Sequence, residues 1–299
     1  MTAPLRRRIE TALNCAIRQR RPLSGGNICD TSLCDMADGR RVVVKVLEPR
    51  PQPTALKSVS LREEAAMLDR LRRTETLPVP AVLYSERDFL ILDHIDNDGV
   101  GGDGVGGASG MTDLADGLAA LHGQQAVRFG YDQPTPIGPL QRPNPWMDSW
   151  PDFFRDHRLM FLGRLAEQAG RLPPGCFARL ERLCGQIDAW IPGGGSSALI
   201  HGDLWMGNVL FDKGRLAAVI DPAVYYADPE IELAFLTLFG GVGDAFFGRY
   251  ADHRAIDPLF FEERQLLYQV EPLLAHAWFF GGSYGRRVDE IVTRYVGSG

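Results

Sequence analysis

The sequence lacks a hydrophobic run long enough to cross a membrane. A membrane-spanning helix needs roughly 18 or more consecutive apolar residues, and no apolar segment of this 299-residue chain is that long. The first residues, MTAPLRRRIETALN, are basic but lack the apolar stretch and small-residue cleavage site of a secretory signal. We therefore expect neither a membrane span nor export.

Cysteine pairs and an excess of positive charge are also missing. The five cysteines form no CxxC motif and are odd in number, which argues against a zinc site or a disulfide framework and favours a reduced cytoplasmic protein. The chain carries 32 Lys and Arg against 38 Asp and Glu, a net charge of −6. Nucleic acids and anionic membranes favour basic surfaces, so neither is a predicted partner.

What is present is an ordinary globular composition, 45% hydrophobic and 23% charged, with a length that suggests two domains or lobes. Helical periodicity over 5–20, ended by Pro22, precedes the β-branched run RRVVVKVLEP. The helical segment SLREEAAMLDRLRR, with Ser60 as its expected cap, precedes the apolar segments AVLYS and DFLILDHI. This pattern predicts a small α+β lobe over residues 1–95.

The segment NDGVGGDGVGGASG, residues 97–110, is too rich in glycine for a helix or a packed strand. We expect residues 96–111 to form a flexible linker or a loop at the mouth of a cleft. The remaining residues, 112–299, are mainly helical in pattern, as in MTDLADGLAALHG and FARLERLCGQIDAWI. They predict a larger, mostly α second lobe.

The stretch HGDLWMGNVLFDKGRLAAVIDPAVYY, residues 201–226, carries the strongest functional signal. NVLF and LAAVI read as short strands joined by DKGR, which suits a hairpin turn. The turn lies midway between Asn208 and Asp221, so an antiparallel hairpin returns both to one open end, next to Asp203 on the preceding loop. Three oxygen-bearing side chains are thus predicted to converge.

Convergent carboxylates are costly without a cation. Two unit charges about 6 Å apart repel by roughly 3 kcal/mol at an effective dielectric constant of 20. Aspartate and asparagine oxygens suit Mg²⁺, which usually arrives with substrate phosphates. The spacing of Asp203, Asn208 and Asp221 is typical of a kinase-like phosphoryl-transfer site, in which Asp203 accepts or orients the acceptor hydroxyl and the other two bind Mg²⁺ on ATP. Singly, each has a plain structural alternative: a loop cap, a turn residue and a strand-ending carboxylate.

A lysine inside VVVKV is rarely buried without a partner. Lys45 is expected to bind the α- and β-phosphates of ATP and to pair with Glu64, with Glu63 as the rival by position. Gly25 and Gly26 precede this strand and are expected to let the backbone approach the phosphates, although a lone pair of glycines is most often a plain turn.

HGDLWMGN, followed by IDPAVYY and LFGG, resembles the fructosamine (ketosamine) 3-kinase family, within the aminoglycoside-phosphotransferase-like kinases. The resemblance covers most of the chain: LSGGNI resembles the family's glycine loop, REEAAML its facing helix, PNPWMDSWPDFFRDHRL a segment rich in Trp, Phe and Arg, and FFGGSY its C-terminal signature. It implies a two-lobed protein-kinase-like α+β fold, with an antiparallel sheet in the small lobe and a larger helical lobe. It also implies ATP and Mg²⁺ as cofactors.

The resemblance further implies the substrate, a ketosamine that is free or on a protein lysine, phosphorylated at a sugar hydroxyl. It favours Glu64 over Glu63, and it makes Asp93, His94 and Ile95 the hinge that faces adenine. Trp205, Trp150 and Arg158 are implied as acceptor-side residues, with core packing as the alternative.

The resemblance also implies supporting roles for two residues. His201 is expected to brace the loop before Asp203, and Glu232 is expected to have a structural role.

Three other functions remain open. The first is an aminoglycoside, choline or other small-alcohol kinase of the same fold. The second is a catalytically inactive nucleotide-binding module, which retention of the whole constellation argues against. A protein kinase is disfavoured because the chain has no HRD, DFG or APE sequence.

Overall fold

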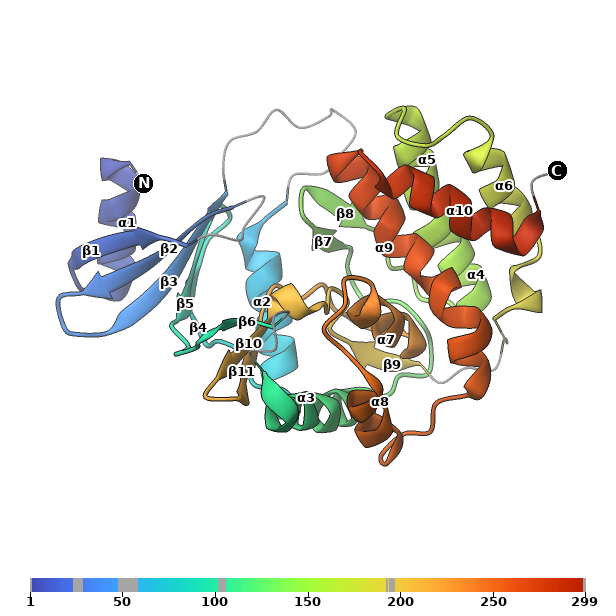
Figure 1. Ribbon diagram of the computed structural model, residues 1–299. Coiled ribbons are helices and arrows are strands. Elements are labelled where there is room, and N and C mark those ends of the chain that lie inside the picture. Colours follow the sequence, from blue (N-terminus) through green and yellow to red (C-terminus); the bar gives the residue numbers. More distant parts are fainter. Residues whose placement is uncertain are drawn as a thin grey trace.

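The structure is a computed structural model that describes residues 2–23, 29–47, 59–101, 106–191, 193 and 197–297. The chain forms a mainly β part, which contains the N-terminus, and a larger mainly helical part, which contains the C-terminus (Figure 1). This two-lobed α+β arrangement confirms the predicted fold class.

The N-terminal part is a five-stranded antiparallel sheet with strand order β1-β2-β3-β5-β4. Its elements are α1 (Ala3–Leu13), β1 (Ile17–Pro22), β2 (Cys29–Met36), β3 (Arg41–Leu47), α2 (Leu61–Arg72), β4 (Val82–Ser85) and β5 (Phe89–Asp93). The backbone N–H of Arg62 donates to the Ser60 hydroxyl, so the predicted cap of α2 is present.

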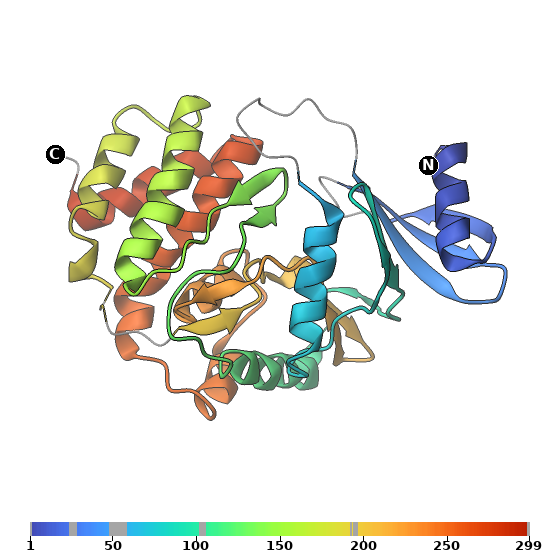
Figure 2. The same cartoon turned by 180° about the vertical axis from the view of Figure 1, so that it is seen from behind.

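The two faces of this sheet are covered by different helices, because side chains alternate along each strand. Val42, Val44, Phe89 and Ile91 form a buried cluster with residues of α1. Leu90 and Leu92 instead pack with α2 on the other face. Figure 2 shows α1 on the side of the sheet away from the helical part. Lys45 lies between the positions that face α1 and therefore points toward α2.

The prediction of one helix over residues 5–20 was wrong. The helix ends at Leu13, because Asn14 adopts the left-handed conformation with φ 47° and caps it. Residues 17–22 instead form the edge strand β1, in which Ile17 pairs with Met36. Pro22 ends this strand, a position that suits a residue without an N–H.

The C-terminal part is mainly helical around one large apolar core. Its helices are α3 (Gly107–Leu121), α4 (Trp150–Phe154), α5 (Met160–Gln168), α6 (Cys176–Cys184), α7 (Glu230–Thr237), α8 (Asp244–Ala251), α9 (Gln265–Phe280) and α10 (Tyr284–Val296), with π-helical turns at Arg155–Leu159 and Phe260–Arg264 and 3₁₀ turns at Ile187–Ala189 and Met206–Asn208. Within the described ranges, no helix combines the length and apolar character needed to span a bilayer.

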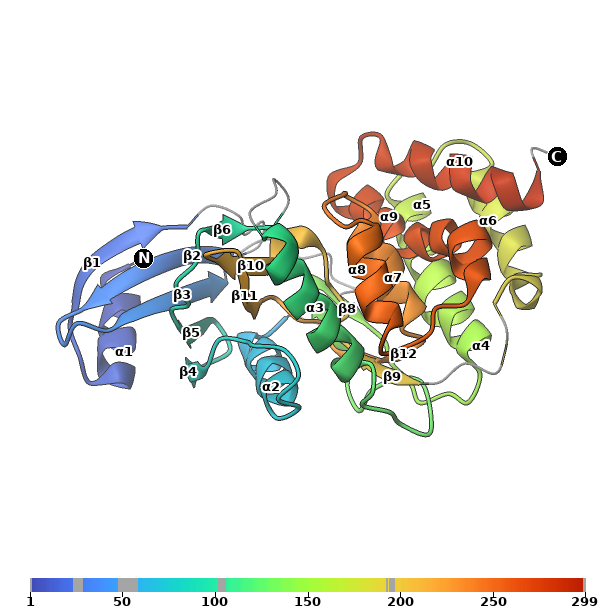
Figure 3. The ribbon, with the colours of Figure 1, turned by 60° about the horizontal axis from the view of Figure 1, so that its bottom comes forward.

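Short strands in this part position the segment of residues 201–226. They are β6 (Gly99–Val100), β7 (Thr135–Ile137), β8 (Leu140–Arg142), β9 (Ala198–Ile200), β10 (Val209–Asp212), β11 (Arg215–Val219) and β12 (Tyr225–Ala227). They pair as β11-β10-β6, β12-β9 and β7-β8. Figure 3 shows β6, β10 and β11 between the N-terminal sheet and the helices.

The glycine-rich segment is more ordered at its ends than its composition suggests. Residues 99–100 pair with β10, and 107–110 form the first turn of α3. A Cβ atom on Gly106 or Gly110 would lie 2.7 Å from the Phe211 ring. These glycines therefore allow close backbone packing around Phe211 rather than a flexible link. Residues 102–105 lie outside the described ranges.

Candidate active site

Lys45 on β3 is the centre of a buried ion-pair cluster. Its Nζ lies 2.6 Å from Glu64 Oε1 on α2 and 2.7 Å from Asp221 Oδ1. Burial alone would lower the pKa of Lys45, but the Asp221 and Glu64 carboxylates raise it. The ammonium therefore stays charged and joins the N-terminal sheet to the catalytic segment. Glu63, the rival partner, instead accepts a hydrogen bond from Gln141.

The predicted hairpin is present and brings Asn208 and Asp221 together. Val209 pairs with Val219 at its open end, and Lys213 and Gly214 form its turn with φ 49° and 74°. The Ile220 N–H donates to the Asn208 carbonyl at 3.0 Å. Asp221 has φ 58°, an uncommon conformation for a residue with a side chain, and its carboxylate meets Lys45.

Asp203 lies on the loop between β9 and this hairpin. Asn208 Nδ2 donates to the Asp203 carbonyl at 2.8 Å and to its Oδ2 at 3.4 Å. Burial raises the pKa of Asp203 to about 7; Arg142 opposes this rise, and the Asp221 and Glu271 charges add to it. The half-buried carboxyl is thus poised as a proton acceptor near neutral pH.

The loop before Asp203 is held by buried groups. Gly202 has φ 81°, and a Cβ atom there would lie 2.1 Å from the Ala223 carbonyl oxygen, so only glycine fits. The Ala223 N–H donates to the His201 carbonyl at 2.8 Å. Because His201 is fully buried and its Nδ1 lies 3.4 Å from the Asp203 N–H, its predicted bracing role is confirmed.

Glu232 on α7 holds the same loop through hydrogen bonds to its backbone. Its carboxylate accepts from the His201 N–H at 3.0 Å and the Gly202 N–H at 2.7 Å. It also meets His122 Nε2 at 3.0 Å. Burial would raise the pKa of Glu232, but the hydrogen bond with His122 lowers it. The predicted structural role of Glu232 is confirmed.

Replacing Glu232 with alanine should destabilise the fold by about 3 kcal/mol, because two buried backbone donors would lose their acceptor. Urea unfolding measures this loss. Glu262→Ala removes an exposed carboxylate from the same lobe and is the matched control. Equal stability of the two variants would show that Glu232 does not brace the loop.

Arg142 is a site residue that sequence reasoning missed. Its buried guanidinium donates to Glu271 Oε1 at 2.8 Å and to the carbonyls of Gly202 and Ala223 at 3.3 and 3.4 Å. It therefore ties β8 and α9 to the loop before Asp203 and to the segment after Asp221, and its charge lowers the pKa of Asp203. Arg142 ends the short strand β8, which no sequence pattern predicted, so this position carried no sequence signal.

The prediction that Trp150 and Arg158 line the acceptor side does not fit the structure, because both are 0% exposed. Trp150 donates to the Tyr268 hydroxyl at 2.9 Å and stacks on Phe154. The Arg158 guanidinium lies over the Tyr225 ring and donates to Asn144 at 2.6 Å. Their helical spacing points both into the core, as it does for Phe154.

Trp205 is placed differently, at the surface two residues after Asp203. Its side chain is 36% exposed and meets the Phe239 ring, itself 43% exposed, at a centroid distance of 5.5 Å. Phe239 in turn contacts His276 on α9. Two partly exposed aromatic rings in contact, which we call the aromatic wall, therefore begin two residues after Asp203.

The remaining predicted residues concern ATP. Asp93 ends β5, and His94 and Ile95 follow it on the way to β6, the position expected of a hinge. Gly25 and Gly26 lie outside the described residues.

The donors at the open end of the hairpin suit a hard cation brought by phosphates. Asn208 uses its Nδ2 as a donor, which leaves Oδ1 as an acceptor, and the Asp221 side chain is 42% exposed. The like charge of Asp221 raises the pKa of Asp203, a repulsion that a divalent cation would offset. In the described part of the chain, no three His, Cys, Asp or Glu residues form a metal cluster. A cation here would need ligands from the substrate, as Mg²⁺ usually does.

Comparison with known proteins agrees with this geometry. A family model described as fructosamine kinase matches residues 2–298. The chain is 30% identical over 284 residues to a probable ketoamine kinase from Synechocystis, covering 92% of this chain and 90% of that protein. A probable ketoamine kinase from Lactiplantibacillus plantarum is 35% identical over 191 residues, covering 63% and 68%.

Among solved structures, a candidate fructosamine-3-kinase from Thermobifida fusca superposes with a TM-score of 0.84, with 28% identity and 98% of both chains covered. An ADP-bound aminoglycoside phosphotransferase has a TM-score of 0.64, with 18% identity and 98% and 97% of the chains covered. The latter likeness shows the fold alone.

Proposed function

Because the chain belongs to the fructosamine kinase family, and is therefore a phosphotransferase, we propose that it transfers the γ-phosphoryl group of ATP to a ketosamine. The acceptor is a sugar joined through its ketone form to an amine, free or on a protein lysine, and the product is the 3-phosphate. The observation that carries the proposal is the cluster of Lys45, Glu64 and Asp221 beside Asp203 and Asn208.

The residues divide the reaction between them. Lys45, held by Glu64, binds the ATP phosphates, and the backbone of residues 93–95 faces adenine. Asn208 and Asp221 would hold Mg²⁺, which neutralises charge on the transferred phosphoryl group when bound. Asp203 accepts the acceptor hydroxyl proton while the oxygen–phosphorus bond forms and the bond from γ-phosphorus to the bridging oxygen of ADP breaks.

The exposed aromatic wall supports a sugar-derived acceptor. Trp205, two residues after Asp203, and Phe239 are partly exposed aromatic rings in contact with each other, and such rings suit the C–H surface of a sugar or the charge of an amine. We propose Trp205 as the acceptor-site residue of the loop. The cytoplasm is the proposed compartment, in keeping with the odd number of cysteines.

The test is ATP consumption by the purified protein with Mg²⁺ and a panel of acceptors. The panel contains free and lysine-linked ribulosamine, erythrulosamine and fructosamine, one aminoglycoside and choline. We expect turnover with ketosamines alone. Turnover only with the aminoglycoside or choline would keep the kinase and overturn the substrate. Bound ATP without turnover of any acceptor would favour an inactive nucleotide-binding module.

A further inference from the structure

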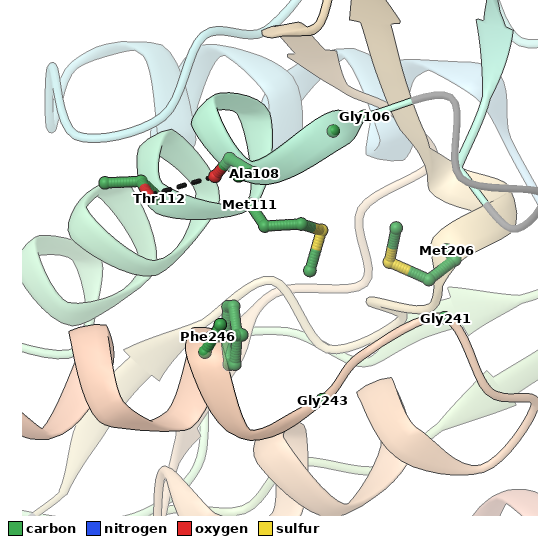
Figure 4. A pocket seen from close by; sticks show the side chains of 10 residues that line it. Gly106, Ala108, Met111, Thr112, Met206, Gly241, Gly243 and Phe246 are labelled. Atoms are coloured by element: carbon green, nitrogen blue, oxygen red, sulfur yellow. Dashed lines mark hydrogen bonds between the residues drawn. The ribbon is translucent and has the colours of Figure 1, made fainter.

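A cavity of ≈ 270 Å³ lies between the first turns of α3 and α8, next to the catalytic loop. Figure 4 shows Met111 and Met206 pointing toward one another across it, with Phe246 on the α8 side. Ala108, Gly241 and Gly243 also line it. Its small residues leave open space, and its methionines and phenylalanine supply flexible apolar walls.

The described lining suits an uncharged group. Among the residues that the structure describes, no Asp, Glu, Lys, Arg or His side chain lines this cavity. The Thr112 hydroxyl on its rim already donates to the Ala108 carbonyl at 3.0 Å. Ala108 and Ala245 in the lining are exposed, so a charged group entering the cavity would lose part of its hydration, and the described lining offers no counter-charge to offset that cost.

The cavity is continuous with the turn that carries the catalytic groups. Met206 begins the 3₁₀ turn that ends at Asn208, and Asn208 hydrogen-bonds Asp203. On the opposite wall, Gly241 follows closely after Phe239, which contacts Trp205. The cavity therefore adjoins both the turn that follows Asp203 and the loop that follows Phe239.

In the proposed acceptor, the substituent on the amine nitrogen is close enough to the reacting hydroxyl to reach this cavity. In a ketosamine, four bonds separate the oxygen on C3 from the amine nitrogen on C1, a span of roughly 5 Å. The nitrogen substituent therefore begins close to the catalytic loop. An engineered apolar cavity of about 150 Å³ holds benzene, so ≈ 270 Å³ can take a benzyl or butyl group.

We propose that this cavity binds the amine-side substituent of the ketosamine, and that the preferred substituent is an apolar alkyl or aryl group. The inference rests on the proposed function and adds the chemical class of the amine. Substrates made from apolar amines then bind better than those with a compact or a charged amine substituent.

Filling the cavity tests this directly. Ala108 and Ala245 line it from α3 and α8, and both are exposed in the structure, so Ala108→Phe and Ala245→Phe should fold. Ser109→Phe adds the same ring to a neighbouring exposed position that does not line the cavity. The substrates are N-methyl, N-butyl and N-benzyl ribulosamine, together with Nα-free ribuloselysine.

In the wild type, KM should fall by about tenfold or more from N-methyl to N-benzyl ribulosamine, the effect of burying one apolar group. Both filling variants should remove this advantage and leave N-methyl ribulosamine within about twofold in kcat/KM. Ser109→Phe should match the wild type.

Three results would overturn the inference. One is a KM that does not depend on the amine substituent. Another is a filling variant that raises KM for ATP instead, which would assign the cavity to the nucleotide. The third is a filling variant that raises KM more for ribuloselysine than for N-benzyl ribulosamine. Turnover of none of the four ketosamines by the wild type would reject the proposed function itself, and the inference with it.

Discussion

Replacing Asp221 with asparagine is expected to lower turnover by about 10³-fold, because the carboxylate that would hold the charge-neutralising Mg²⁺ is lost. Asparagine keeps the shape of the side chain and tolerates the left-handed backbone at φ 58°. The loss should therefore appear in kcat and in a higher Mg²⁺ requirement, without unfolding. Steady-state kinetics over a Mg²⁺ titration measures both.

Asp212→Asn is the matched control, since Asp212 lies on the same hairpin at the turn end, away from Lys45. It should leave kcat within a few-fold of the wild type. Near-normal activity of Asp221→Asn would contradict the assigned site. Because Lys45 also pairs with Glu64 at 2.6 Å, its ammonium keeps a buried partner in this variant. Unchanged thermal unfolding would confirm that the loss is catalytic.

Local sequence signals predicted the parts of the site that depend on short-range geometry. A hairpin turn midway between Asn208 and Asp221 fixes their convergence through strand register alone. A single charge in an apolar strand requires a buried partner, and Glu64 is that partner. Strands β3, β4 and β5 followed from their β-branched and apolar runs for the same local reason, whereas β1 and β2 were not predicted.

The missed features depend on distant contacts. Arg142 reaches Glu271 and the loop at Gly202 across large separations in the chain. The family resemblance placed Trp150 and Arg158 beside the acceptor, with core packing as the alternative, and tertiary packing buries both. Residues 97–110 were expected to form a flexible linker or a loop at the mouth of a cleft, and composition did not reveal the close packing of Gly106 and Gly110 against Phe211.

Replacing Asp203 with asparagine is expected to lower kcat by about 10³-fold, since the amide cannot accept the hydroxyl proton. In the wild type, kcat/KM for ATP reports the protein before ATP binds. Its pH profile should fall tenfold per unit below the Asp203 pKa of about 7, because the protonated carboxyl cannot act as a base. Initial rates from pH 5.5 to 8.5 measure this limb.

The same carboxyl should cost stability at high pH. Its pKa rises from the ordinary value of 3.8 to about 7 on folding, so the native state binds the proton more tightly than the unfolded chain. Stability is therefore highest below pH 4 for this group, falls between pH 4 and 7, and stays reduced above 7. Asp203→Asn removes the fall, so the variant should gain stability relative to the wild type as pH rises.

A variant at Asp228 separates the effect of a buried carboxyl on stability from its effect on kcat. Burial also raises the pKa of Asp228 to about 7, yet it accepts the Glu230 N–H at the start of α7 and takes no part in the proposed reaction. Asp228→Asn should gain stability at pH 8 and keep near-normal kcat, whereas Asp203→Asn should gain stability and lose kcat. Urea unfolding at pH 5 and 8 measures the stability of Asp203→Asn relative to the wild type. If the variant showed no relative gain in stability at pH 8, burial would not raise the pKa of the Asp203 carboxyl. The acid limb of the activity profile would then belong to another group.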